Sequence, residues 1–263
     1  MIEAHYRALQ PGEIIVFSIK NNTVKDAQIL FLGRKVLLAR DPKREKLMTF
    51  CGLDLGLRPG LYPIKIHIQR MDGRWEVLEK QLSVIEREFP EKRLWVEEKY
   101  VTPPPEVVER IRRESEILRS LYGRFTPEWL GEKSFIIPAA GKIFENFGER
   151  RIYNTKPRSS HGGIDISALP GTPVKASNSG EVVLASDLYF SGKTVIIDHG
   201  LGLFSLYCHL SEIKVKRGQM VQRGDLIGKV GASGRVTGPH LHWGIKVHES
   251  RIDPFSLLDL SFD

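Results

Sequence analysis

Glycine recurs at short intervals through the second half of the chain, and this spacing strongly constrains the fold. Short apolar runs such as Glu181–Leu184 and Thr194–Ile197 lie between the glycines. Glycine adopts positive φ angles at little cost and weakens helices, so it favours tight turns. We therefore expect a compact, tightly turned antiparallel β structure from about residue 134 onward. The glycines concerned are Gly171, Gly180, Gly192, Gly200, Gly202, Gly218, Gly224, Gly228, Gly231 and Gly234.

The first hundred residues also consist of short runs of alternating polarity between turn signals, for example Glu13–Ile19 and Gly60–Ile68. Strands this short and this closely spaced are typical of a small antiparallel sandwich of immunoglobulin-like type. Two histidines, His5 and His67, stand apart from other candidate ligands, and no catalytic pattern is visible in this part. The sequence therefore predicts a β-sandwich accessory domain over residues 1–100.

A helix is expected between the two β-rich parts. The prolines Pro103–Pro105 end the strand pattern, and proline suits the first turn of a helix. Gly123 is a suitable C-terminal stop. We predict a helical linker over residues 101–130 and a catalytic domain over residues 131–263, so the fold class is mainly β. The apolar residues at helical spacing are Val107, Val108, Ile111, Leu118, Leu121 and Tyr122.

The charge of the chain is moderate and evenly spread. The 263 residues carry a formal net charge of +7, with 18 basic and 14 acidic side chains in residues 1–100 and 13 and 10 in residues 151–263. Nucleic-acid binding is not indicated, because there is no concentrated basic stripe. The sequence has no long apolar stretch, so we expect no membrane span. Its start lacks the apolar region of a secretory signal, so we expect either a cytosolic protein or one whose signal was removed and replaced by a start methionine. Cys51 and Cys208 are predicted to be buried free thiols.

Two short motifs in the second half contain residues of the kind that bind metals: His161-Gly162-Gly163-Ile164-Asp165 and His240-Leu241-His242. On a strand, an even separation places two side chains on the same face, so the members of each pair would project together. Two histidines and one carboxylate form a ligand set of catalytic zinc sites, which keep a fourth position open for water. Each histidine alone is more typical of a structural residue, but together the motifs favour a zinc hydrolase.

A further histidine, His209, follows Tyr207 in a strand-like run. The same alternation places Tyr207 and His209 on a common face, where the tyrosine is either a further hydrogen-bond donor or, the interpretation we favour, a structural residue. The run Asp187–Gly192 is expected to form an aromatic turn, which either walls a substrate groove or simply packs.

The combination of motifs resembles the LytM/lysostaphin-type zinc metallopeptidases, which cleave peptidoglycan cross-bridges. The resemblance covers about residues 133–258 and includes Asn146–Arg150 and Gly171–Val174 besides the histidine motifs. Ser160 and Cys208 stand where family members often have proline and alanine, and neither difference removes a ligand.

The resemblance implies a role for five side chains. His161, Asp165 and His242 would bind one zinc ion. His209 and His240 would form the catalytic pair, although which of them is the general base is open. The implied fold of the C-terminal part is the glycine-rich antiparallel β domain of this family.

The function implied is that of a zinc-dependent endopeptidase hydrolysing the peptide cross-links of bacterial peptidoglycan through a metal-activated water. The simplest expected bond is D-alanyl–diaminopimelate, with glycine bridges left open. One alternative is a catalytically silent cell-wall-binding or amidase-activating protein of the same fold, although such members lose zinc ligands. Another is a lipoyl- or biotinyl-like carrier, which the histidines disfavour. The substrate implies a periplasmic or secreted location, and the N-terminal domain would target the wall, recruit a protein partner or cover the active site.

Overall fold

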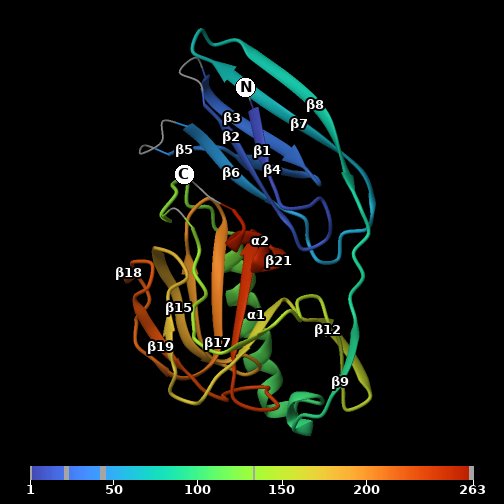
Figure 1. The fold of residues 1–263 in the computed structure, drawn as a ribbon, viewed down its shortest axis with the longest axis vertical. Helices are drawn as coiled ribbons and strands as arrows, with labels where there is room; N and C mark the ends of the chain where they lie inside the picture. Colours follow the sequence, from blue (N-terminus) through green and yellow to red (C-terminus); the bar gives the residue numbers. More distant parts are fainter. Residues whose placement is uncertain (1, 21–23, 42–45, 133, 261–263) are drawn as a thin grey trace.

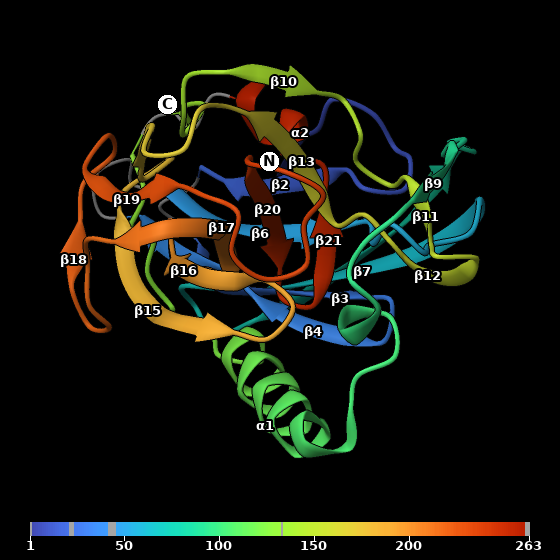
Figure 2. The same ribbon diagram turned by 90° about the horizontal axis from the view of Figure 1, so that it is seen from below.

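The computed structural model describes residues 2–20, 24–41, 46–132 and 134–260. Two β-rich units are stacked along the long axis of the molecule, with the N-terminal strands in the upper unit and the C-terminal strands in the lower one (Figure 1). Seen from below, helix α1 (Pro105–Tyr122) lies along one side of the molecule (Figure 2). The mainly β fold class predicted from the sequence is confirmed.

The upper unit consists of two four-stranded antiparallel sheets, ordered β1-β2-β6-β5 and β4-β3-β7-β8. Buried side chains from both sheets, among them Ile15, Phe17, Ile29 and Ile66, form its core. This is the sandwich that the alternating runs predicted. Its strands are β1 (Ile2–His5), β2 (Ile14–Ile19), β3 (Val24–Phe31), β4 (Arg34–Leu37), β5 (Ala39–Asp41), β6 (Lys46–Gly52), β7 (Gly60–Arg70) and β8 (Trp75–Val84).

Strand β2 is buried along its whole length. Successive side chains of a strand point to opposite faces, so both faces of β2 must be covered. Ile15 and Phe17 face the sandwich core, whereas Ile14 and Val16 belong to the core of the lower unit. At the same junction the ring of Phe50 lies 5.2 Å from that of Trp129. The two units therefore share a continuous apolar interface.

A buried ion cluster reinforces this junction. Glu13 is fully buried and accepts a hydrogen bond from Arg7 Nη2 at 2.6 Å. Asp253 is also buried and accepts one from Arg87 Nη2 at 2.7 Å. The two arginines offset the cost of burying these carboxylates, since each carboxylate is paired and hydrogen-bonded.

The connection between the units begins with strand β9 (Glu91–Leu94). This strand pairs in parallel with β11 (Arg150–Tyr153), which pairs antiparallel with β12 (Lys156–Ser160). A 3-10 turn, η1 (Glu98–Tyr100), precedes α1. The predicted helix is present, with proline at its N-terminal end and Gly123 as its C-cap. Its last turn buries Leu121 and Tyr122 against the lower sheet.

The lower unit is built on a ten-stranded sheet with the central order β10-β13-β20-β17-β16-β15-β18. One face carries a large core that includes Tyr207 and Trp243, and α1 packs against part of the other face. A short helix, α2 (Phe255–Leu258), lies at the junction with the sandwich. The remaining strands are β10 (Lys142–Phe144), β13 (Gly163–Ser167), β14 (Pro173–Lys175), β15 (Gly180–Leu188), β16 (Gly192–Asp198), β17 (Leu203–Ile213), β18 (Met220–Val221), β19 (Leu226–Val230), β20 (Leu241–Val247) and β21 (Ser250–Ile252).

The glycines of this unit serve two different purposes. Gly192, at the turn between β15 and β16, has a φ of 62°, which is the left-handed conformation expected at a tight turn. Gly180 instead sits where strands come close together: a Cβ there would lie 2.3 Å from the carbonyl oxygen of Asp198. The prediction of positive φ is thus confirmed at some of the glycines, while others allow close backbone approach.

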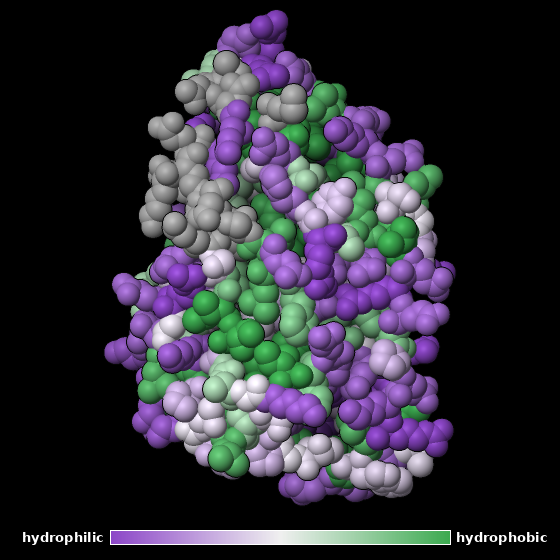
Figure 3. Space-filling model, viewed as in Figure 1, coloured by the Kyte–Doolittle hydropathy of each residue, from purple (hydrophilic) through white to green (hydrophobic). Residues whose placement is uncertain are grey.

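Figure 3, in the same view as Figure 1, shows polar side chains over much of the surface and an apolar patch on the lower unit. Within the described ranges, neither α-helix has the length and apolar character needed to cross a bilayer. Cys51 and Cys208 are both free and buried, as predicted.

Candidate metal centre

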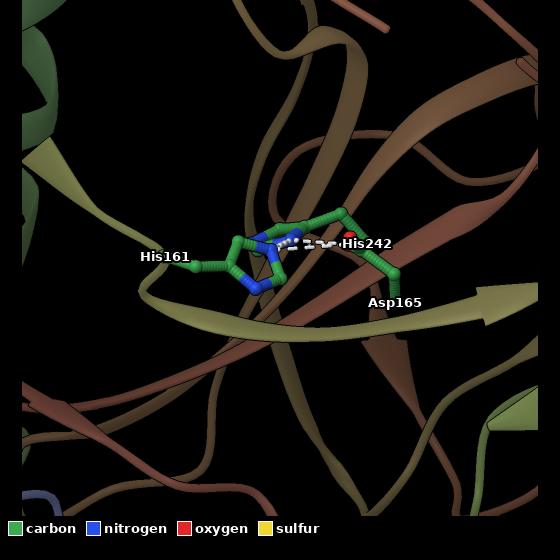
Figure 4. A group of neighbouring side chains, drawn as sticks. All are labelled: His161, Asp165 and His242. Carbon is green, nitrogen blue, oxygen red and sulfur yellow. Dashed lines mark hydrogen bonds and ion pairs between the residues drawn. The ribbon is translucent and has the colours of Figure 1, made fainter. Parts of the chain in front are cut away.

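The three predicted metal ligands converge in the lower unit (Figure 4). Asp165 on β13 lies directly opposite His242 on β20 in the antiparallel register. His161 precedes β13 rather than lying on it, and its imidazole turns toward the other two side chains. Gly163 allows β13 and β20 to lie close together at this point, because a Cβ there would lie 2.4 Å from the carbonyl oxygen of Trp243.

The distances between the three ligand atoms suit a small metal ion. His161 Nε2 and His242 Nδ1 each lie 3.1 Å from Asp165 Oδ1, and the two nitrogens are 2.7 Å apart. Ligands of a tetrahedral ion bound at about 2.0–2.1 Å are roughly 3.3 Å from one another. Only a small outward movement of each side chain would admit such an ion, so the donor set fits a metal centre.

The second carboxylate oxygen of Asp165 is held by the protein. Arg151 Nη2 donates to Asp165 Oδ2 at 2.7 Å, and Asn146 Nδ2 donates to the same atom at 2.9 Å. Because Oδ2 is engaged in this way, Oδ1 is the oxygen that faces the imidazoles. Carboxylates oriented by such partners make well-positioned metal ligands.

The protonation states also fit metal binding. Burial lowers the pKa of His161 and of His242, so both imidazoles favour the neutral form that ligates metals. Burial alone would raise the pKa of Asp165, but hydrogen bonds and charge interactions with the two histidines outweigh it, and the net pKa is far below its usual range. His161 Nδ1 lies 2.9 Å from the Asn146 carbonyl oxygen, which leaves Nε2 for the metal.

The predicted catalytic histidines lie beside this cluster. The rings of His209 and His240 are 4.9 Å apart, and His240 Nε2 is 3.6 Å from Asp165 Oδ1. Each ring places Nδ1 2.8 Å from a backbone carbonyl, that of Ser233 for His209 and that of Gly238 for His240. Donation from Nδ1 to these carbonyls fixes the ring orientation and leaves Nε2 as the working atom.

The prediction that Tyr207 and His209 share one face of a strand is wrong. His209 has a φ of 64°, and the pairing of β17 shifts its register next to it, so the regular alternation stops there. Tyr207 points into the core, where its hydroxyl accepts a hydrogen bond from Ser177 N at 2.7 Å. The interpretation of Tyr207 as a structural residue is therefore the one that the structure supports.

Two cavities meet at this centre, and together we call them the groove. The larger, of 550 Å³, extends from His161 and His242 to the end of α1. The smaller, of 410 Å³, extends past Asp165 and His240 toward β9. Since Arg151, Tyr153, His209 and Arg235 line both cavities, the metal centre lies where they join.

The aromatic turn of residues 187–192 contributes one wall. Phe190 lines the larger cavity, whereas Tyr189 packs against Tyr100, with ring centroids 5.4 Å apart. The Arg235 guanidinium lies 4.8 Å from the Phe190 ring and 4.6 Å from the Tyr153 ring, and so links the two sides of the groove. Of the two aromatic side chains of this turn, only Phe190 lines the groove, together with Leu188 and Ser191.

Sequence reasoning assigned no role to Asn146 or Arg151, although both contact Asp165. Asn146 lay in a motif noted for its family resemblance, and that motif was the available signal. The sequence predicted α1 only as a linker, whereas Leu118, Arg119 and Tyr122 of this helix line the groove. His199 is a buried structural residue with Nδ1 2.7 Å from the Ser179 carbonyl oxygen.

Comparison with known proteins identifies relatives of the lower unit. Residues 159–254 match the model of peptidase family M23. The chain is 45% identical over 107 residues to the peptidoglycan DD-endopeptidase ShyA of Vibrio cholerae, covering 40% of this chain and 25% of ShyA. It is 40% identical over 97 residues to the DD-carboxypeptidase/endopeptidase Mpg of Neisseria meningitidis serogroup B, covering 37% of this chain and 22% of Mpg. The match thus spans about a quarter of the length of these relatives.

A solved structure extends the similarity to almost the whole chain. A Pseudomonas aeruginosa protein assigned to peptidase M23 superposes with a TM-score of 0.74 at 32% sequence identity, over 96% of both chains. At this coverage the likeness includes the N-terminal sandwich and α1 as well as the lower unit. The chain therefore belongs to peptidase family M23.

Proposed function

We propose that the protein is a zinc-dependent endopeptidase that hydrolyses the peptide cross-links of peptidoglycan. One observation carries this proposal: two imidazoles and one carboxylate converge within 4.8 Å of one another, and two further histidines flank them in an open groove. The name of the relative ShyA, a peptidoglycan DD-endopeptidase, points to the same substrate, and the name of Mpg points to an endopeptidase.

Zinc is the metal that this donor set favours. His161, Asp165 and His242 would hold it, since catalytic zinc sites use three nitrogen and oxygen ligands and keep an open position. Calcium would require more oxygen ligands than these residues offer. When bound, zinc acidifies a water molecule and polarises the scissile carbonyl.

His209 and His240 would carry out the proton transfers of the reaction. Burial lowers the pKa of both, so each is neutral near pH 7 and able to accept a proton at Nε2. We assign His240 as the general base that takes a proton from the attacking water, because it lies nearer to Asp165 Oδ1. The proton that His240 takes from the water then passes to the leaving amine. His209 Nε2 carries a lone pair while Nδ1 donates to Ser233, so His209 can donate a hydrogen bond to the developing oxyanion only after it has taken up a proton itself.

A catalytically silent protein of the same fold is less well supported. Such a protein needs no metal ligands, yet all three ligand positions and both flanking histidines are present here. The proposed substrate lies outside the cytoplasmic membrane, so we also propose a periplasmic or secreted site of action.

Digestion of purified sacculi by the zinc-loaded protein tests this function. Mass spectrometry of the muropeptides should show cross-linked dimers disappearing, and a chelator should prevent their loss. Unchanged sacculi in the presence of one bound zinc per chain would reject the endopeptidase. The mass of the products identifies the bond cleaved, and thereby distinguishes diaminopimelate cross-links from glycine bridges.

A further inference from the structure

A lysine side chain, Lys246, lines the part of the groove that extends to the end of α1. Lys246 follows His242 by four residues on β20, and both side chains line the larger cavity. An even separation on a strand places them on the same face. At about 3.3 Å per residue, Lys246 lies about 13 Å along the strand from His242. An extended peptide spans the same distance in about four residues.

Lys246 is held in place without a carboxylate partner among the described residues. Its ammonium nitrogen lies 4.4 Å from the centre of the Tyr122 ring and 3.3 Å from the backbone carbonyl oxygen of Glu249. The Glu249 carboxylate forms its ion pair with Arg34. Burial removes part of the hydration of the Lys246 ammonium and, with the nearby Arg251 guanidinium, lowers its pKa, whereas the Asp54 and Glu249 carboxylates oppose this shift. An anion bound beside it would offset that loss.

The rest of the groove has the same sign of charge. Five lysines and arginines line its described walls against two carboxylates, Asp165 and Glu249. Asp165 belongs to the metal centre, and Glu249 is bound by Arg34. Arg119, in the last turn of α1, lines the same cavity one helical turn before Tyr122. A groove lined by one sign of charge attracts ligands of the opposite sign.

We propose that Lys246, assisted by Arg119, forms a subsite that binds a free carboxylate of the substrate peptide within about four residues of the scissile bond. The inference rests on the proposed function and deepens it, because it names the class of peptide. Stems containing glutamate or diaminopimelate residues carry such carboxylates, whereas glycine bridges have no side-chain carboxylate. The groove therefore selects acidic cross-linked peptides.

Binding of two matched substrates tests the subsite directly. One is a cross-linked disaccharide–tetrapeptide dimer with free carboxylates, and the other is the same dimer with these groups amidated. Calorimetry would use the zinc-loaded full chain carrying His240→Ala, so that the substrate survives. We expect the carboxylated dimer to bind about tenfold tighter or more, the range of one charge-assisted hydrogen bond. Adding Lys246→Met should abolish this preference, and Lys246→Arg should retain it.

Lys216→Met is the matched control, because Lys216 is exposed and lies outside both cavities. Thermal unfolding verifies that each variant is folded. Equal affinity for the two dimers, binding of neither, or a preference that survives in folded Lys246→Met protein would overturn the subsite. Hydrolysis by protein with His240 intact is scored separately. Selective binding without hydrolysis would reject the endopeptidase and keep the subsite, whereas hydrolysis without selective binding would do the reverse.

Discussion

Asn146 holds Asp165 at two points. Its side-chain oxygen accepts the backbone N–H of Asp165 at 3.1 Å, and its amide nitrogen donates to Oδ2 of the same residue at 2.9 Å. The backbone carbonyl of Asn146 also accepts from His161 Nδ1. One residue in the loop between β10 and β11 thus orients two of the three proposed metal ligands.

Replacing Asn146 with alanine should therefore weaken metal binding. The substitution removes both side-chain contacts to Asp165 but keeps the carbonyl that supports His161. Loss of a hydrogen-bond partner of a metal ligand typically lowers metal affinity or activity by about 10- to 100-fold. Zinc affinity measured against a competing chelator checks this. Asn178→Ala is the control, because Asn178 is buried away from the metal centre and bonded to the backbone of Glu132. It should lower thermal stability and leave zinc affinity unchanged.

The proposed ligands and the proposed proton-transfer residues should respond differently to mutation. His161→Ala and Asp165→Ala should lose bound metal and hydrolysis together. His240→Ala should keep a full equivalent of zinc and lose roughly 10²- to 10⁴-fold in turnover, the usual contribution of a general acid or base. Metal analysis and muropeptide release, measured on the same samples, distinguish the two classes. Zinc missing from the His240→Ala protein would refute this division of roles.

Local sequence patterns identified the strands that carry Asp165 and His242, which meet because the two strands pair directly. Alternation does not explain the position of His161, which precedes its strand. The same rule failed at His209, where a left-handed backbone turns the side chain to the other face. The contacts of Asn146 and Arg151 with Asp165 depend on loop geometry that spacing does not encode.

Longer-range packing was equally inaccessible to the sequence. The run that forms β2 indicated a strand, but only the structure shows that Ile14 and Val16 bury their side chains against the other unit. Likewise, helical spacing predicted α1 without showing that Arg119 and Tyr122 line the groove. A periodic pattern identifies an apolar face, and the partner of that face depends on the tertiary fold.

The shared junction predicts that the two units stabilise each other. Asp253→Ala would leave the Arg7 and Arg87 guanidinium groups partly buried with one carboxylate fewer, and breaking such a buried pair costs about 3–5 kcal/mol. Denaturant unfolding followed by tryptophan fluorescence measures the loss. Glu79→Ala removes the exposed pair with Lys65 and should cost less than about 1 kcal/mol. Similar losses for both variants would contradict a stabilising role for the junction cluster.

His199 gives the fold a specific dependence on pH. It is completely buried, with Nδ1 2.7 Å from the Ser179 carbonyl oxygen and Nε2 2.7 Å from Ser205 Oγ. Burial lowers its pKa to about 4. Between the unfolded pKa of about 6.5 and this value, the unfolded chain binds a proton that the folded protein does not. Stability from this group is therefore complete above about pH 6.5 and declines as the pH falls toward 4.

The decline should amount to about 3 kcal/mol of unfolding free energy, since each pKa unit is worth about 1.4 kcal/mol. Denaturant unfolding at a series of pH values from 7 to 4 measures it. His199→Gln should be less stable at pH 7, yet lose about 3 kcal/mol less than the parent between pH 7 and 4, because glutamine does not titrate. His5→Gln, at an exposed position on β1, should follow the parent curve. Parallel curves for the parent and His199→Gln would show that His199 does not set the acid sensitivity.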